Sequence, residues 1–308
     1  MTKILITEFI NTNSLQTLKQ SFEVHYNEML WGQPEEITKL IKEFDGLIVR
    51  NKTKVTKDII DHAHTLKFVG RLGVGLDNID TQHCKNKGIH VQPATGMNAD
   101  SVVEYVASSA LSLIKKIPLF NNGTIKGEWP RTTIKSEEIS GKTLGLIGYG
   151  SIGKKVSKYC SNFGLNIVAY DPYLKDQNNE QDVKFVKLDE IYNVSNIISL
   201  HLPLTDETRN LINKVSFSKM KQQPIIINTS RGSVINEDDL IEAYNNNLIS
   251  GFALDVFENE PIKQEFYNKI NDNMNCILTP HISGVTTQSN ERVCNFIAEK
   301  TLEFFKNR

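Results

Sequence analysis

The stretch KTLGLIGYGSIGKKVSKYCSNFGLNIVAYD, residues 142–171, decides the fold of this chain. A short apolar run, Thr143 to Ile147, predicts a strand that leads directly into the pattern G-x-G-x-x-G. In dinucleotide binding, the first glycine allows a tight turn, the second lets the backbone approach a pyrophosphate, and the third lets the helix pack closely on the strand. The residues of this predicted phosphate-binding turn are Gly148, Gly150, Ser151, Ile152 and Gly153.

A helix and a second strand are predicted to follow the glycines. Apolar residues recur at helical spacing in the helix, at Ile152, Val156, Tyr159 and Phe163. Its N-terminus would offer free N–H groups and a positive dipole end to phosphates. The second strand, Asn166 to Tyr170, ends on Asp171, where a carboxylate would bind the adenine-ribose hydroxyls and repel a 2′-phosphate. A glycine-rich turn alone also arises for backbone reasons, but this context predicts a Rossmann unit that prefers NAD to NADP.

Composition limits the classes of protein to consider. The 308 residues allow one or two domains, and Lys plus Arg total 35 against 36 for Asp plus Glu. Such a balanced charge argues against nucleic-acid and membrane partners. The opening MTKILITEFI predicts a first strand rather than a signal peptide, and no apolar run approaches the ~20 residues of a membrane helix. The cysteines are scattered, at Cys84, Cys160, Cys276 and Cys294. Their spacing predicts no metal site and a reducing compartment, so we expect a cytoplasmic protein.

Residues 1–98 alternate predicted strands and helices, which indicates a second, smaller α/β domain with a parallel sheet. The predicted strands are Lys3–Thr7, Gly46–Val49, Phe68–Val69 and Ile89–Val91. The predicted helices are Ser14–Gln20, Pro34–Phe44, Lys57–Ala63 and Thr81–Lys87. Pro34, followed by two glutamates, is a favourable helix start because proline suits the first position and acids suit the N-terminal dipole.

Two places in this smaller domain are candidates for binding an anion. Arg50 follows the strand Gly46–Val49, at a carboxyl end where open α/β sheets place ligands. The stretch from Gly70 to Asp80 has glycines on both sides of Val74, at Gly73 and Gly75, which allows successive N–H groups to face a carboxylate. The alternatives are a solvated surface arginine and a plain strand-to-helix turn capped by Asp77.

Two long helices frame the Rossmann unit. Asp100 to Pro118 is predicted as one amphipathic helix that crosses between the domains and is stopped by Pro118. Residues 121–140 form a surface excursion suited either to a subunit contact or to an ordered loop of a monomer. The final helix, Thr286 to Phe305, is expected to pack back on the first domain. We therefore expect residues 1–98 plus 285–308 to form the substrate domain and residues 99–284 the NAD-binding domain.

Polar or charged residues follow four successive predicted strands of the larger domain. The strands are Asn196–Leu200, Pro224–Asn228, Gly251–Leu254 and Asn275–Thr279. The residues at their ends are His201, Arg231, Asp255 and His281. Because ligands bind beyond the carboxyl ends of parallel strands, these side chains are expected to converge on one crevice.

Three of the residues in this region suit hydride chemistry. His281 is a suitable acid/base because an imidazole titrates near neutrality. Glu260 would hydrogen-bond the far ring nitrogen and fix the tautomer, and Arg231 would hold a substrate carboxylate and polarise the adjacent carbonyl. Each residue alone is more often structural, so the prediction rests on the order Arg, Glu, His beyond a Rossmann fingerprint.

The motifs together identify a family. They are GVGLDNID from Gly73, LGLIGYGSIG from Leu144, HLPLTDETRNLI from His201, NTSRGSVINEDDL from Asn228, ALDVFENEP from Ala253 and TPHISG from Thr279. In these motifs the chain resembles the D-isomer-specific 2-hydroxyacid dehydrogenases along essentially its entire length. The resemblance implies an α/β fold of two doubly wound parallel-sheet domains, the larger a Rossmann NAD-binding domain, with the active site in the cleft between them. It also implies NAD as cofactor and a homodimer formed through the NAD-binding domain.

The resemblance also implies roles for individual residues. Arg231 would clamp the substrate, Glu260 would partner the histidine, and His281 would be the acid/base. The backbone of Val74 and Gly75 would hold the substrate carboxylate. The resemblance assigns the remaining positions to the cofactor: Asp171, His201, Pro203, Thr208, Thr229, Asp255 and Gly284. Of these, Asp171 would bind the ribose, and Thr229 and Asp255 would lie near the nicotinamide.

The substrate implied is an acidic three-carbon 2-hydroxy acid. LIVRNKTKVTKDII from Leu47 is similar to phosphoglycerate dehydrogenases, whereas HISGVTTQSNERV and VQPATGMNADSVVEYV are more similar to sulfolactate dehydrogenases. Both substrates carry a carboxylate and a second anion, which suits Arg50 and Arg71. We expect 3-phosphoglycerate first, with (S)-sulfolactate dehydrogenase or hydroxypyruvate/glyoxylate reductase as alternatives. With the sequence ending at Arg308, no ACT-type regulatory domain and no serine feedback through one are expected.

Two other classes share this fold. Formate dehydrogenases pair the histidine with glutamine, so Glu260 argues against them. NAD-sensing transcriptional corepressors can retain the three catalytic residues, and the absence of long low-complexity or basic appendages argues against that class here.

Overall fold

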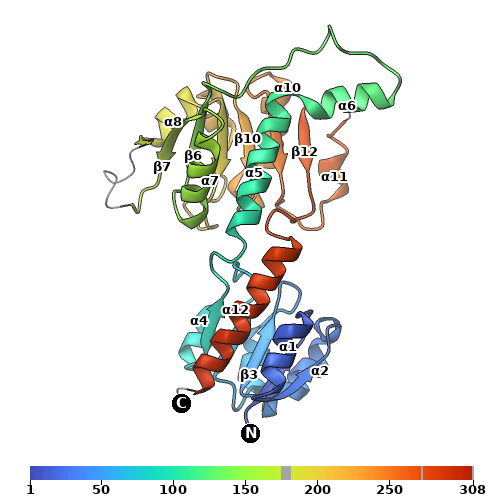
Figure 1. Cartoon of the computed structure of the whole chain (residues 1–308), viewed down its shortest axis with the longest axis vertical. Coiled ribbons are helices and arrows are strands. Elements are labelled where there is room, and N and C mark those ends of the chain that lie inside the picture. Colours follow the sequence, from blue (N-terminus) through green and yellow to red (C-terminus); the bar gives the residue numbers. More distant parts are fainter. Residues whose placement is uncertain (175–181, 272, 307–308) are drawn as a thin grey trace. The chain divides into compact units, whose positions relative to one another are not determined.

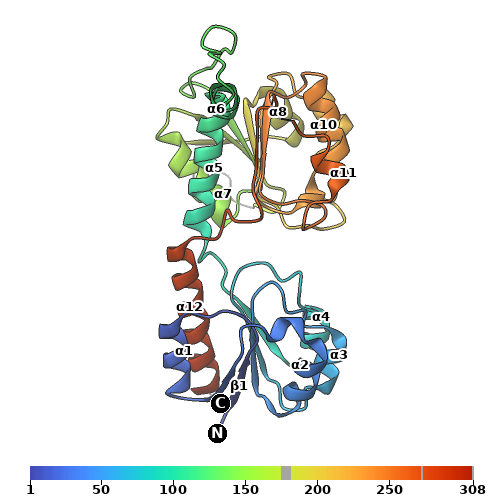
Figure 2. The same ribbon diagram turned by 90° about the vertical axis from the view of Figure 1, so that its right-hand side faces the viewer.

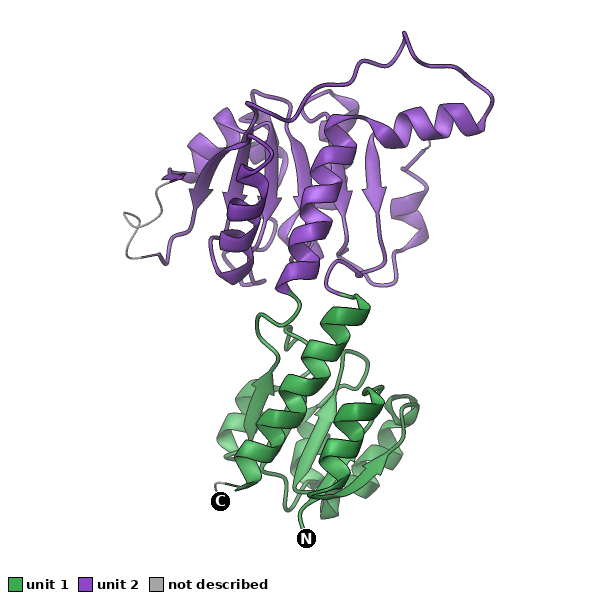
Figure 3. Cartoon of the chain, in the orientation of Figure 1, with its two compact units in different colours: residues 1–98, 285–308 green, residues 99–284 purple. Residues whose placement is uncertain are grey.

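The computed structural model describes residues 1–174, 182–271 and 273–306 (Figure 1). They form two compact units, shown in separate colours in Figure 3. Unit 1 comprises residues 1–98 and 285–308, and unit 2 comprises residues 99–284. Within the described residues, no helix combines the length and apolar composition that a membrane crossing requires.

Unit 1 contains a five-stranded parallel sheet with the order β2-β1-β3-β4-β5. This is one of the common doubly wound orders. Its strands are β1 (Lys3–Ile6), β2 (Glu23–Tyr26), β3 (Gly46–Val49), β4 (Phe68–Arg71) and β5 (His90–Pro93). Its helices are α1 (Thr12–Lys19), α2 (Pro34–Leu40), α3 (Lys57–His62), α4 (Thr81–Asn86) and α12 (Thr287–Lys306). In Figure 2, α1 and α12 cover one face of the sheet, and α2, α3 and α4 cover the other.

The apolar residues of unit 1 explain this layering. Successive residues of a strand point to opposite faces, so β1 buries Leu5 on one side and Ile4 on the other. Leu5 packs in the cluster that includes residues of α2, α3 and α4. Ile4 packs in the cluster that receives Val293 and Ile297 from α12. The last helix of the chain therefore completes the core of the first unit.

Unit 2 contains a seven-stranded parallel sheet with the order β12-β11-β10-β9-β6-β7-β8. The order reverses between β6 and β9, which is the switch point where open α/β sheets bind dinucleotides. The strands are β6 (Thr143–Ile147), β7 (Asn166–Tyr170), β8 (Val183–Phe185), β9 (Ile197–Leu200), β10 (Ile225–Asn228), β11 (Gly251–Leu254) and β12 (Cys276–Leu278). The α/β fold with two parallel sheets is thus confirmed.

Helices cover both faces of the larger sheet. On one face, α5 (Ala99–Ile114) and α7 (Ser151–Ser161) bury residues such as Val106 and Val156 against β6 and β7. On the other face, α8 (Leu188–Val194), α9 (Lys214–Ser218), α10 (Glu237–Asn245) and α11 (Gln264–Tyr267) contribute to a second core cluster. Figure 2 shows α5 and α7 on the side of the sheet opposite α8, α10 and α11.

Several predicted elements differ from the structure. The predicted helix ending at Pro118 is two helices: α5 ends at Ile114, Lys116 is left-handed at φ +53°, and α6 runs Ile117–Ile125. Pro118 lies in the first turn of α6, where a proline is tolerated because no N–H bond is lost. The predicted excursion from residue 121 therefore begins inside a helix. Tyr159 is 47% exposed and lies off the buried stripe of α7, which Val156 and Cys160 occupy instead.

Candidate active site

The glycine-rich turn links β6 to α7 and makes two close packing contacts. Gly148 has φ +95°, and a Cβ there would lie 2.3 Å from the His201 carbonyl oxygen. A Cβ on Gly153 would lie 2.4 Å from the Gly148 carbonyl oxygen. Gly150 differs, since a Cβ added at this position would have no atom within 4 Å. Two glycines therefore permit close packing, and the middle one leaves open space at the N-terminus of α7.

Asp171 braces this turn from the end of β7. Its Oδ2 accepts a hydrogen bond from Tyr149 N–H and its Oδ1 one from Tyr173 N–H, both at 2.9 Å. Each carboxylate oxygen has a second lone pair that these bonds leave available. The acid is thus half-buried beside the glycine turn and can still accept from a hydroxyl.

The loop after β9 is compact and lies against the same turn. Thr208 Oγ1 donates to the Pro203 carbonyl at 2.7 Å and accepts from Thr205 N–H at 2.7 Å. His201 Nε2 lies 3.0 Å from Ser199 Oγ. Desolvation lowers the pKa of His201 to about 4, so the imidazole is neutral at pH 7.

The turn after β10 is shaped by a buried asparagine. The side chain of Asn228 donates to the Arg231 carbonyl at 2.9 Å and accepts from Ser230 N–H at 3.0 Å. Arg231 Nη1 donates to the Ser230 carbonyl at 2.6 Å. Thr229 Oγ1 is buried without a hydrogen-bond partner among the described residues. A buried hydroxyl left unpaired is uncommon, and a bound ligand would satisfy it.

The loop after β11 lies directly on that turn. A Cβ on Gly232 would come within 1.9 Å of the Phe257 carbonyl carbon. Phe257 N–H donates to Glu260 Oε1 at 3.1 Å, and Glu258 N–H donates to Glu237 Oε1 at 2.7 Å. Burial raises the pKa of Glu237. The loop that carries Glu260 is thus held by a glycine contact on one side and by α10 on the other.

Glu260 and His281 form the central pair. His281 Nδ1 lies 2.8 Å from Glu260 Oε2. Since a carboxylate only accepts, Nδ1 carries the proton and Nε2 is left without a partner among the described residues. The two side chains are 39% and 53% exposed, so a small molecule can reach them. His281 has a left-handed backbone at φ +57°, an unusual conformation for a residue with a side chain.

Asp255 is fully buried and holds the loop that contains His281. Its Oδ1 accepts from Thr279 Oγ1 and from Ile282 N–H, and its Oδ2 from Ser283 N–H, each at 2.7 Å. The His281 N–H donates to the Asp255 carbonyl at 2.8 Å. The carboxylate that the family resemblance assigns to the cofactor thus has a clear structural role under this loop.

In unit 1, Arg50 is held in place. Its Nη2 donates to Asn290 Oδ1 on α12 at 2.6 Å, and its guanidinium carbon lies 5.7 Å from the centre of the Phe9 ring. Glu8, which is 3% exposed, accepts from the N–H groups of residues 50, 52 and 53. Arg50 is thus half-buried and oriented by contacts within unit 1.

The glycine bend after β4 also carries a cation. The Arg71 guanidinium lies against Gly73, so closely that a Cβ on that glycine would meet Nη1 at 1.3 Å. Within the described chain, the N–H groups of Val74 and Gly75 donate to no protein group. A guanidinium and two available N–H groups lie on one short segment, which suits a carboxylate.

Of the four residues predicted at successive strand ends, Asp255 and His281 are in direct contact, and Gly232, next to Arg231, packs on the loop after β11 that carries Glu260. The fourth, His201 after β9, lies against the glycine-rich turn. Gly284, Ser151 and Ile152 lie in the same unit. Sequence reasoning missed residues whose contacts are long-range, namely Tyr105, Glu237 and Asn290. No group of three or more His, Cys, Asp or Glu in the described chain could hold a metal ion.

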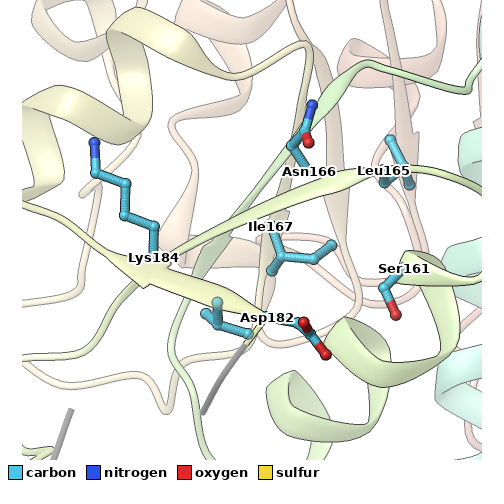
Figure 4. A pocket seen from close by; sticks show the side chains of 7 residues that line it. Ser161, Leu165, Asn166, Ile167, Asp182 and Lys184 are labelled. Carbon is cyan, nitrogen blue, oxygen red and sulfur yellow. The ribbon is translucent and has the colours of Figure 1, made fainter. Parts of the chain in front are cut away.

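A surface hollow lies elsewhere in unit 2 (Figure 4). Its lining residues are Ser161, Leu165, Asn166, Ile167, Asp182, Val183 and Lys184. These lie at the amino ends of β7 and β8, whereas the glycine-rich turn follows the carboxyl end of β6. The hollow is therefore at the opposite edge of the sheet from the candidate site.

Comparison with known proteins decides the family. Residues 107–283 match the model of the NAD-binding domain of D-isomer specific 2-hydroxyacid dehydrogenases. The chain belongs to this family. It is 41% identical to the hydroxypyruvate reductase of Thermotoga maritima over 268 residues, which are 87% of each chain.

Other relatives act on different 2-hydroxy acids. The chain is 38% identical to the D-3-phosphoglycerate dehydrogenase of Methanocaldococcus jannaschii over 97% of its own length, but it spans only 57% of that relative. It is 35% identical to the (S)-sulfolactate dehydrogenase of Chromohalobacter salexigens over 95% of each chain. The solved D-lactate dehydrogenase of Aquifex aeolicus, complexed with NAD and lactic acid, matches 99% of the chain at 30% identity with a TM-score of 0.85, and the match covers 96% of that structure.

The chain is therefore an NAD-dependent D-2-hydroxyacid dehydrogenase. The residues present fit the cofactor. Gly150 leaves space for a phosphate at a helix N-terminus, Asp171 can accept from ribose hydroxyls, and Thr229 has a buried hydroxyl without a partner in the described chain.

Proposed function

We propose that the chain reduces a 2-oxo acid to the D-2-hydroxy acid, and catalyses the reverse oxidation, with Arg231, Glu260 and His281 as its catalytic residues. The 2.8 Å hydrogen bond between Glu260 and His281 is the observation that supports this most strongly. It fixes a tautomer whose Nε2 is free to exchange a proton with substrate.

Each side chain has a defined part in the proposed reduction. NADH, when bound, would supply the hydride for this reduction. Arg231 binds the substrate carboxylate and stabilises the charge that develops on the carbonyl oxygen. Protonated His281 gives its Nε2 proton to that oxygen, and Glu260 stabilises the imidazolium before transfer. In the oxidation direction His281 takes the proton back.

We further propose an acidic three-carbon substrate, with 3-phosphohydroxypyruvate and 3-phosphoglycerate first. Arg50 is oriented by Asn290 and keeps donors available, and Arg71 lies on the glycine bend with the N–H groups of Val74 and Gly75. These groups suit a carboxylate and a second anion. (S)-Sulfolactate has the same charge pattern, and hydroxypyruvate is the alternative that lacks the second anion.

The test is the initial rate of NADH oxidation with 3-phosphohydroxypyruvate, sulfopyruvate, hydroxypyruvate and pyruvate. The proposal expects turnover with at least one of them, highest with a dianionic substrate, and a D-configured product. The absence of turnover with all four would reject the proposed activity. A preference for hydroxypyruvate would keep the reaction and reject the acidic substrate.

We infer a homodimer formed through unit 2. Three apolar side chains on or just after α6 are well exposed: Ile117 at 53%, Ile125 at 75% and Trp129 at 79%. Burying such side chains is favourable, and a second copy of the chain would cover them. Light scattering after gel filtration should give twice the mass of the chain, and the monomer mass with Trp129 changed to Asp.

We also infer residence in a reducing compartment, the cytoplasm. The cysteines of the described chain are free thiols. Burial raises the pKa of Cys84 and Cys276 to about 11 and that of Cys160 to about 12, so these thiols are unreactive at neutral pH. Cell fractionation with an antibody to the chain would check the location.

A further inference from the structure

A chain of hydrogen bonds runs from α5 to the loop that carries His281. Tyr105 on α5 places its hydroxyl 2.6 Å from Thr279 Oγ1, and Thr279 Oγ1 lies 2.7 Å from Asp255 Oδ1. Asp255 in turn accepts from the N–H groups of Ile282 and Ser283. All of these residues belong to unit 2.

The direction of each bond in this chain can be assigned. A threonine hydroxyl has one proton, and Thr279 gives that proton to Asp255, because a carboxylate can only accept. Thr279 Oγ1 must therefore accept from the hydroxyl of Tyr105, which also has Ser109 as a side-chain hydrogen-bond partner. Burial raises the pKa of Tyr105, which favours the protonated phenol that this assignment requires.

The hydrogen-bond chain ends at the segment around His281, whose backbone needs support. His281 has φ +57°, a conformation that is unfavourable for a residue with a side chain. Its N–H donates to the Asp255 carbonyl, while the Asp255 carboxylate binds the two N–H groups that follow. Asp255 thus fixes the backbone on both sides of the histidine. The hydrogen bond from the Thr279 hydroxyl to Asp255 Oδ1 helps to fix the orientation of this carboxylate.

We infer that Tyr105 is a positioning residue for the proposed acid/base: through Thr279 and Asp255, its hydroxyl holds His281 in the conformation that faces Glu260. Tyr105 touches neither substrate nor the reacting atoms in this scheme. Its effect rests on the proposed catalytic role of His281. Hydrogen-bonded chains strengthen each member by polarisation, so loss of the first donor weakens the later bonds.

The primary test is Tyr105→Phe, which removes one oxygen and keeps the ring. We expect kcat to fall about 3- to 10-fold, the size of one neutral hydrogen bond, with the KM for NADH and the melting temperature nearly unchanged. Tyr192→Phe is the control, since Tyr192 is a buried tyrosine of the same unit that lies on α8, whereas Tyr105 is half-buried on α5. A kcat for Tyr105→Phe within about twofold of wild type, or an equal fall in the control, would overturn the inference.

A double-mutant cycle distinguishes an effect that acts through these hydrogen bonds from an effect on general packing. Thr279→Val removes the relay hydroxyl, and Thr279→Ser retains it. If Tyr105 acts through Thr279, Tyr105→Phe should cause little further loss in the Thr279→Val background, while Thr279→Ser should keep most of the activity. Fully additive losses would show that Tyr105 acts by another route.

Amide hydrogen exchange tests the geometry without relying on turnover. In Tyr105→Phe, the N–H groups of Ile282 and Ser283 should exchange faster than in wild type, whereas Tyr192→Phe should leave them unchanged. If the wild type reduces no 2-oxo acid, the proposed function fails while faster exchange still supports the hydrogen-bond chain. Unchanged exchange at these two N–H groups would reject the proposed role of the hydrogen bonds from Tyr105 through Thr279 to Asp255, whatever the activity.

Discussion

Gly232 lies so close to Phe257 that a Cβ at position 232 would come within 1.9 Å of the Phe257 carbonyl carbon. It would also come within 2.3 Å of Glu258 N. These atoms are backbone, which cannot rotate away as the end of a side chain can. The contact joins the turn that follows Arg231 to the loop that carries Glu260, so it sets the spacing of two proposed catalytic residues.

Gly232→Ala should therefore impair catalysis more than stability. The new methyl group must displace the loop from Phe257 to Glu260, and a shift of ~1 Å can cost about 10²-fold in rate. We expect kcat/KM to fall by about that factor in NADH-coupled assays. Gly32→Ala is the control, because no atom lies within 4 Å of that Cβ position. Full activity in Gly232→Ala would mean that the loop yields without consequence.

Glu260→Gln should retain the loop and lose the ion pair. Its amide oxygen can still accept from Phe257 N–H, which now binds Glu260 Oε1 at 3.1 Å. A neutral amide stabilises an imidazolium less than a carboxylate does, so we expect kcat to fall about 10- to 100-fold. Glu258→Gln, two positions earlier in the same loop, should have little effect. Equal losses in the two variants would argue against a specific role for the Glu260 charge.

Arg50 should set the preference for a second anion, and Asn290 should orient it. In Arg50→Ala, the rate advantage of 3-phosphohydroxypyruvate over hydroxypyruvate should fall by about 10-fold or more, since a charge-assisted hydrogen bond contributes roughly 1.5–3 kcal/mol. Asn290→Leu should cause a smaller loss of the same kind, and Asn290→Gln should restore part of it. Kinetics with both oxoacids measure the ratio. An unchanged ratio in Arg50→Ala would remove this residue from substrate recognition.

Glu8 should contribute to the stability of unit 1. Its buried carboxylate accepts from the N–H groups of Arg50, Lys52 and Thr53, at 2.8, 3.1 and 2.9 Å. Glu8→Ala leaves these donors unpaired, which should lower the free energy of unfolding by about 2–4 kcal/mol. Urea denaturation followed by circular dichroism measures this, with Glu299→Ala on the exposed side of α12 as control. A change under ~0.5 kcal/mol would contradict the expectation.

The sequence predicts the central strands well, and the reason is physical. Runs such as Gly46–Val49 and Pro224–Asn228 are apolar because both faces of the sheet are covered, which marks them clearly. The edge strand β2 has the sequence EVHY, and β8 has only VKF. Both are partly exposed and carry charged or polar side chains, so an apolar run does not reveal them. The break at Lys116 was also missed, because a lysine gives no sign of a left-handed turn.

The candidate site could be predicted only in part. Arg231, Glu260 and His281 follow successive strands, and strand order alone places such residues at one edge of a sheet. Contacts between distant segments have no local pattern: Tyr105 reaches Thr279 from another helix, and Arg50 meets Asn290 only because α12 packs on unit 1. The burial of Asp255 cannot be predicted from the sequence either, since an aspartate at a strand end can face solvent or pack under a loop.

The most direct measurement is the rate of NADH oxidation with 3-phosphohydroxypyruvate in wild type and in His281→Ala, together with the NADH affinity of both. We predict turnover in wild type, a fall of about 10²- to 10⁴-fold in the variant, and nearly equal NADH affinity. Turnover in His281→Ala close to that of wild type would contradict the proposed acid/base role of this histidine.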